Sequence, residues 1–191
     1  LEPSPINVEL LKKNVAANRL DTTIQIEEKA IAGQNGTMQL LISGYSNLNT
    51  TYRSKLVDGK QIPFLKTIEV EAVTIDDYLK DKRAPELIKM DIEGAEVEVV
   101  KGMQRTLGCT RSMSLFIEIH PQLLDNTAPM LDFLRTLMLN GFETLAVISH
   151  DDFYRNIAGI ARVEHLSIME LITDPRVTNG TTAFEVFFHK R

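Results

Sequence analysis

The chain has 191 residues, of which 43% are hydrophobic and 25% are charged, and this composition is typical of a globular domain. We therefore expect residues 1–191 to form a single domain that buries a sizeable core. The formal net charge of -5, without any basic run, argues against a nucleic acid partner. No apolar run approaches the roughly 20 residues that span a bilayer, so we expect no membrane insertion and a cytoplasmic location.

The first seven residues, LEPSPIN, lack the pattern of a signal peptide and resemble the edge of a longer chain, so we expect further sequence upstream. Ser4 and Pro5 predict a helix start, because a serine hydroxyl caps free amides and proline fits the first turn. Apolar residues at helical spacing then predict an amphipathic helix that continues through Asn18.

The next segment predicts a β-hairpin. Residues 24–31 are β-rich at their start, and Asn35-Gly36 is a tight-turn signal that precedes a second apolar run at 38–42. We therefore expect two paired strands there. The polar segment 45–63 shows no period and is expected to be a long loop.

Strands and helices then alternate along the chain. Residues 66–73 alternate as a strand, 74–79 favour a short helical turn, and 87–92 form a compact apolar strand. A helix is expected at 95–107, and Gly108 would end it in a left-handed cap.

The same alternation continues to the end of the chain. Strands are expected at 114–119, 142–148 and 183–189, with helices at 129–139 and around 164–171. This succession is typical of βαβ units and predicts an α/β fold with a parallel sheet.

Polar residues stand where the predicted strands end, which is where ligands bind in open parallel sheets. Asp91 and Glu93 end one apolar strand, and Glu118 and His120 end the next. Glu2 precedes the first helix. A carboxylate at Glu2 suits the diol of a ribose, but it is equally well explained as an acid that favours the dipole of the following helix.

The two strand ends leave three chemical interpretations open. Carboxylates and an imidazole can remove a proton from a hydroxyl, and they can equally hold a divalent metal. A buried ion pair between Asp91 and Lys89 is the third interpretation. We favour proton transfer over a metal site, because no third strand end supplies another fixed ligand.

Three stretches resemble one known family. The run VEAVTIDDYL followed by PELIKMDIEGAEVEVVKGM resembles a central signature, SLFIEIHP resembles the strand motif after it, and EPSPINVELLKKNVAANRL resembles an earlier helical segment. The family is the FkbM-type methyltransferases, within the class I enzymes that use S-adenosylmethionine (SAM). The resemblance implies a Rossmann-like sheet, mostly parallel with an antiparallel C-terminal strand, and SAM as cofactor.

The resemblance also implies roles for single residues. Glu2 matches the acid that holds the ribose of SAM, Pro3 would lie against the adenine, and Ala30 would border its other side. Asp91 matches the position where the methionine end of the cofactor meets the acceptor hydroxyl. The residues expected to act in catalysis are Asp91, Glu93, Glu118 and His120.

One part of the family pattern has no match in this sequence, namely the N-terminal strand and its glycine-rich loop of the type Asp-x-Gly-Ala-Asn-x-Gly. Glycines there let the backbone approach the cofactor, so we expect either a longer natural protein or an unusual arrangement. The predicted function is O-methyl transfer to a hydroxyl of a sugar, lipid or polyketide-like small molecule. The alternatives are a non-catalytic or degenerate Rossmann-like binding module and, last, a metal hydrolase.

Overall fold

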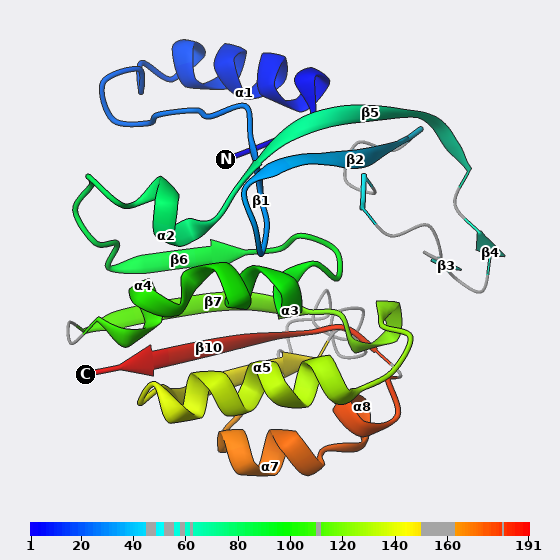
Figure 1. Cartoon of the computed structure of the whole chain (residues 1–191), viewed down its shortest axis with the longest axis vertical. Helices are drawn as coiled ribbons and strands as arrows, with labels where there is room; N and C mark the ends of the chain where they lie inside the picture. The colour runs from blue at the N-terminus through cyan, green and yellow to red at the C-terminus, as the bar shows by residue number, and fades with distance from the viewer. Residues whose placement is uncertain are drawn as a thin grey trace.

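The computed structural model describes residues 1–44, 49–51, 63–109, 112–149, 163–180 and 182–191, and the backbone of two short strands between them. The described strands form a three-stranded sheet, a five-stranded sheet and a separate two-stranded pair (Figure 1). Helices alternate with strands along the chain and pack on the five-stranded sheet, so the fold is mixed α/β.

The three-stranded sheet has the order β1-β5-β2, with β1 at Ala30–Ile31, β2 at Gly36–Ser43 and β5 at Phe64–Val73. β1 runs parallel to β5, whereas β2 runs antiparallel to it. The predicted hairpin between 24–31 and 38–42 is therefore wrong. The long strand β5 lies between the two segments and takes the backbone hydrogen bonds that a hairpin would have used.

Helix α1 (Pro5–Ala17) begins where the sequence predicts, but its contacts differ from the prediction. The Ser4 hydroxyl makes no capping hydrogen bond and is buried without a partner. The carboxylate of Glu2 instead accepts a hydrogen bond of 2.7 Å from the Ser4 N–H. Val8 is the buried residue of the helix, and Leu10 is 57% exposed, so the predicted apolar stripe faces largely outward.

The five-stranded sheet has the order β6-β7-β10-β8-β9. Its strands are β6 (Leu87–Met90), β7 (Met113–Ile119), β8 (Glu143–Ser149), β9 (Val163–Glu164) and β10 (Phe184–Lys190). β6 and β7 are parallel, and β10 is antiparallel to both β7 and β8. The C-terminal strand β10 is antiparallel as expected and lies between β7 and β8, which run in the same direction as β6. The short strand β9 is antiparallel to β8, so the sheet contains both parallel and antiparallel strands.

The helix predicted at 95–107 is divided into three pieces, α3 (Glu96–Val99), the 3-10 helix η2 (Val100–Met103) and α4 (Gln104–Gly108). Gly108 is the last residue of α4, and Cys109 follows with φ -59°, so the predicted left-handed cap is wrong. Gly102 in η2 packs tightly on the segment after β1. A Cβ atom there would lie 2.8 Å from the carbonyl oxygen of Ala32.

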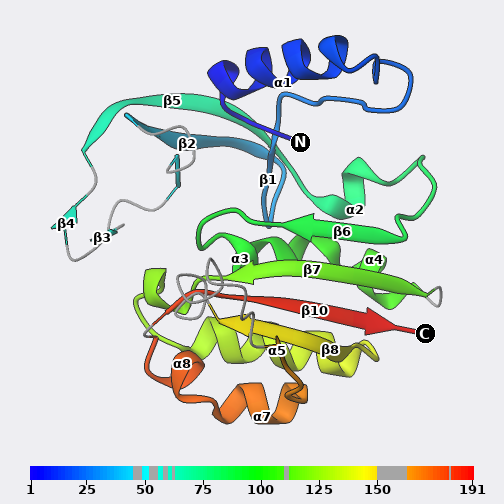
Figure 2. The ribbon, with the colours of Figure 1, turned by 180° about the vertical axis from the view of Figure 1, so that it is seen from behind.

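The helices α3, α4 and α5 (Ala128–Leu139) cover one face of the five-stranded sheet, and Figure 2 shows the sheet from the other side. The strands alternate accordingly, with Leu115 and Ile117 of β7 fully buried under the helices. The remaining helical segments are α2 (Ile75–Tyr78), η3 (Pro121–Leu123), α7 (Ile168–Thr173) and α8 (Pro175–Thr178).

The predicted loop 45–63 lies mostly outside the described residues. The structure describes two short strands within it, β3 (Leu56–Val57) and β4 (Lys60–Gln61), which pair with each other. Within the described part of the chain, no helix combines the length and the apolar character that crossing a bilayer requires.

Candidate active site

The turn that follows β6 is the centre of the site. Glu93 and Gly94 both have a left-handed backbone, with φ of 58° and 99°, and reverse the chain between β6 and α3. Glycine adopts this conformation freely, but a glutamate there costs free energy that surrounding contacts must offset. Non-glycine residues with a left-handed backbone cluster at functional sites, and contacts with neighbouring residues must hold them there.

Glu96 holds this turn from beneath. Its side chain is fully buried, and its Oε1 accepts hydrogen bonds from the N–H of Ile92 at 3.2 Å and of Gly94 at 3.1 Å. The same oxygen lies 3.2 Å from Nδ1 of His120. Glu96 was not among the residues predicted from the sequence, although an acid among the apolar residues of this helix was a signal for it.

His120 follows β7 and lies among three carboxylates. Its Nε2 is 3.3 Å from Oε1 of Glu118 and 3.6 Å from Oε2 of Glu93, while Nδ1 faces Glu96. Burial lowers the pKa of His120, but the hydrogen bonds to Glu118 and Glu96 and the charges of Glu96 and Glu93 outweigh it and raise the pKa to about 10. At neutral pH the imidazole is therefore a cation that donates from both nitrogens.

Asp91 lies beside Glu118 at the ends of the parallel strands β6 and β7. Burial raises the pKa of Asp91, and the negative charge of Glu118 raises it further. Lys89, whose Nζ lies 3.7 Å from Oδ2 of Asp91, opposes the shift. Asp91 therefore holds a proton more readily than an isolated aspartate does.

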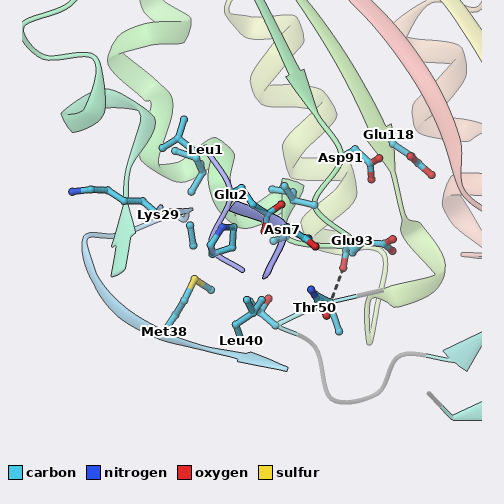
Figure 3. A pocket seen from close by; sticks show the side chains of 17 residues that line it. Leu1, Glu2, Asn7, Lys29, Met38, Leu40, Thr50, Asp91, Glu93 and Glu118 are labelled. Atoms are coloured by element: carbon cyan, nitrogen blue, oxygen red, sulfur yellow. Dashed lines mark hydrogen bonds between the residues drawn. The ribbon is translucent and has the colours of Figure 1, made fainter. Parts of the chain in front are cut away.

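These acids open onto a cavity of about 440 Å³ between the two sheets (Figure 3). That volume is within the range of small-molecule sites, roughly 300–1,000 Å³. The cavity is lined by Leu1, Glu2, Pro3, Asn7, Lys29, Ala30, Ile31, Met38, Leu40, Asn49, Thr50, Thr51, Asp91, Ile92, Glu93, Ala95 and Glu118. Apolar side chains from the three-stranded sheet form one side, and Asp91, Glu93 and Glu118 form the other.

The structure brings most of the residues predicted from the sequence to this one cavity: Glu2, Pro3, Ala30, Asp91, Glu93 and Glu118. His120 is not among the described residues that line it, because Glu93 and Glu118 stand between the imidazole and the cavity. Their roles in binding and catalysis stay predictions.

Sequence reasoning missed several lining residues, including Lys29 and Thr50. Lys29 points away from the acids in Figure 3 and forms a salt bridge with Glu71. Thr50 is buried, and its hydroxyl donates to the carbonyl oxygen of Glu93 at 3.4 Å. Neither residue lies at the end of a strand of the five-stranded sheet, and polar residues at such strand ends are the signal that the sequence offers.

Asp91, Glu118 and His120 are also close enough to consider a metal ion, because one ligand atom from each lies within 4.8 Å of the others. A histidine that ligates a metal ion does so as a neutral imidazole, however. The positive charge of His120 already neutralises part of the acidic group. The described contacts form an ion network of three carboxylates around a protonated histidine.

The model of the methyltransferase FkbM domain matches residues 1–169. The chain belongs to the FkbM methyltransferase family. The match includes every residue that lines the cavity, whereas β10 lies beyond it. Comparisons with curated proteins and with solved structures found no match. The family predicted from the sequence is thus confirmed, and an FkbM domain implies a methyltransferase.

Proposed function

We propose that this FkbM domain is a SAM-dependent O-methyltransferase that acts on a hydroxyl of a small molecule such as a sugar, a lipid or a polyketide. The observation that carries the proposal is a cavity that has apolar side chains on one side and Asp91, Glu93 and Glu118 on the other. A nucleoside needs apolar surface for its base, while acids complement a positive charge and a hydroxyl that loses a proton.

The lining residues fit SAM in their chemistry. Glu2 would accept hydrogen bonds from the ribose hydroxyls, and Pro3 and Ala30 would lie against the adenine. When bound, SAM supplies an electrophilic methyl group on a positively charged sulfur. Asp91, Glu93 and Glu118 would favour that charge at their end of the cavity, because opposite charges attract strongly where water is excluded.

Asp91 is the residue that we propose as the base. The sequence left the choice between His120 and Asp91 open, but an imidazole with a pKa of about 10 is already protonated at neutral pH. Burial and the charge of Glu118 raise the pKa of Asp91, which makes its carboxylate a better proton acceptor. Asp91 would accept the proton of the acceptor hydroxyl, and the negative charge of the neighbouring Glu118 favours that protonation.

The test is calorimetry with S-adenosylhomocysteine and an assay of methyl transfer to a panel of hydroxyl acceptors, with the full-length protein. We expect saturable binding, and a kcat at least about 100-fold lower in Asp91→Asn, since general bases contribute roughly 10²–10⁴-fold. Asp132→Asn, at an exposed site on α5, is the matched control and should leave kcat unchanged.

Two results would contradict the proposal. No binding of S-adenosylhomocysteine to the full-length protein would favour the non-catalytic binding module instead. Unchanged turnover in Asp91→Asn, with unchanged binding, would remove Asp91 from the role of base.

A further inference from the structure

We infer that Glu96 is a positioning residue of this site. Its buried carboxylate holds the turn after β6 and His120 in the arrangement that brings Asp91, Glu93 and Glu118 together. This inference rests on the proposed methyltransferase function, which it deepens. Glu96 does not line the cavity and acts through the residues that do.

The geometry of one oxygen atom is the first argument. Oε1 of Glu96 is shared by the N–H of Ile92, the N–H of Gly94 and Nδ1 of His120, at 3.1–3.2 Å. The first two groups belong to the turn after β6, and the third follows β7. A single carboxylate thus joins the carboxyl ends of two neighbouring strands, from which Asp91 and Glu118 emerge.

The conformation of the turn is the second argument. Glu93 has a φ of 58°, which its own side chain disfavours. The hydrogen bond from Gly94 to the buried Glu96 carboxylate stabilises this conformation. Without the acceptor, the buried N–H of Gly94 and the partly buried N–H of Ile92 would lose their partner. Such a loss costs about 1–3 kcal/mol for a fully buried group. We therefore expect the turn to rearrange and Glu93 to leave the cavity edge.

The charge of Glu96 is the third argument. A neutral glutamine could accept the same three hydrogen bonds, and Oε2 of Glu96 is buried without a hydrogen bond partner. Burial of a carboxylate is costly unless its charge is paired. The cation that pairs with it is His120, which Glu93 and Glu118 face from the other side. Glu96 therefore keeps His120 charged, and the charged imidazole lets Glu93 and Glu118 stand close together.

The experiment compares Glu96→Gln and Glu96→Ala in the full-length protein. Glu98→Gln is the matched control, because Glu98 lies two residues further in α3, is exposed and pairs with Lys101. Three quantities are measured: the titration of the His120 imidazole by NMR, the amide chemical shifts of Ile92 and Gly94, and the pH profile of kcat with the KM of the acceptor.

Glu96→Gln should keep the amide shifts close to those of the parent, because the amide oxygen replaces the carboxylate as acceptor. The imidazole of His120 should lose its proton at a pH at least one unit lower than in the parent protein, which is a tenfold change in its acid dissociation constant. The kcat should fall about tenfold, and the KM of the acceptor should stay within threefold of the parent value. Glu96→Ala should also move both amide shifts and lower kcat about 100-fold. Glu98→Gln should change none of these.

The inference is overturned if Glu96→Gln leaves both the titration of His120 and the pH profile of kcat unchanged, because Glu96 would then be only a structural acceptor. If Glu96→Ala does not fold, Glu96→Gln decides alone. If the full-length protein neither binds S-adenosylhomocysteine nor transfers methyl groups, the proposed function fails, but the NMR titration still decides whether Glu96 positions His120.

Discussion

The two main sheets of this domain differ in how much apolar surface they bury. The five-stranded sheet packs on α3, α4 and α5 through a core that includes Leu134, Phe184 and Phe188, all fully buried. The buried cluster of the three-stranded sheet is much smaller and consists of Ala30, Leu40, Ile42, Val70 and Ala72. Buried apolar area is the main source of folding free energy, so the larger sheet should carry most of the stability.

The two sheets contribute different kinds of side chain to the cavity. The apolar lining of the cavity comes from Leu1, Pro3 and the three-stranded sheet, and the acids Asp91, Glu93 and Glu118 come from the ends of β6 and β7 and the turn that follows β6. Side chains such as Met38 and Leu40 contact the cavity as well as the small sheet. Part of the apolar surface of the small sheet therefore faces the cavity instead of a protein core, whereas the large sheet buries its apolar surface in an extended core.

The largest expected effect is a pH dependence of the free energy of unfolding, caused by His120 at the end of β7 in the large sheet. His120 has a pKa of about 10 in the folded protein against 6.5 ordinarily, so its stabilisation is complete below pH 6.5 and is lost as the pH rises towards 10. The free energy of unfolding should fall by on the order of 4 kcal/mol over this range. Chemical denaturation at a series of pH values measures it, and His120→Gln should flatten the profile. A flat profile in the parent protein would contradict the charged state of His120.

The second prediction concerns the large core directly. Leu134→Ala, in α5, should lower the free energy of unfolding by about 3 kcal/mol, because it removes buried methyl groups and leaves a cavity. Leu139 in the same helix is 82% exposed, so Leu139→Ala is the control and should stay within about 0.5 kcal/mol. Leu40→Ala in the small cluster should cost less than Leu134→Ala. The reverse order in urea denaturation would break the comparison.

The third prediction tests the junction between the two sheets. Gly102→Ala should cost about 2 kcal/mol of unfolding free energy, because the new Cβ would meet the Ala32 carbonyl oxygen at 2.8 Å and the Thr74 side chain at 2.9 Å. The matched control is Gly108→Ala at the end of α4, where the Cβ would lie 3.9 Å from the side-chain oxygen of Asn140. Equal melting temperatures for the two variants would mean that the sheets are not tightly packed at this point.

The smallest expected effect separates binding from stability. Glu2→Gln should weaken binding of S-adenosylhomocysteine about tenfold, equal to about 1.4 kcal/mol, because a charged acceptor for the ribose hydroxyls becomes neutral. The free energy of unfolding should not change, since glutamine can still accept the hydrogen bond from Ser4. Glu9→Gln, at an exposed position of α1, is the calorimetric control. A loss of stability without a loss of affinity would assign Glu2 to the fold rather than to the ligand.

Most strands of the large sheet could be predicted from the sequence. Residues 114–119 and 183–189 alternate apolar and polar side chains, and they form β7 and β10 with the corresponding alternation of burial. Alternation directly reports which side chains can face a core, whatever the rest of the chain does. The acids Asp91 and Glu118 could also be found from the sequence, because the carboxyl ends of parallel strands lie at one edge of a sheet.

The partners of each element were decided only by the tertiary structure. The turn signal at Asn35-Gly36 predicts a hairpin, but β5 lies between the two segments, and Asn35 instead accepts a hydrogen bond from the Thr74 N–H at 2.9 Å. The predicted cap at Ser4 is absent: its hydroxyl is buried without a partner, and the Ser4 N–H donates to the Glu2 carboxylate. The local sequence indicates which secondary structures a segment can adopt. Segments that are distant in the sequence then decide which hydrogen-bond partners it finds.

Glu96 marks the limit of sequence reasoning most clearly. By itself, the sequence determines the family, the succession of strands and helices, and the acids of the strand ends, because each of these depends on local spacing. Whether an acid in the helix after β6 points to solvent or into the protein depends on where His120 lies, 24 residues further along the chain. Only the packed structure brings the two charges together, and only there can a buried carboxylate be stable.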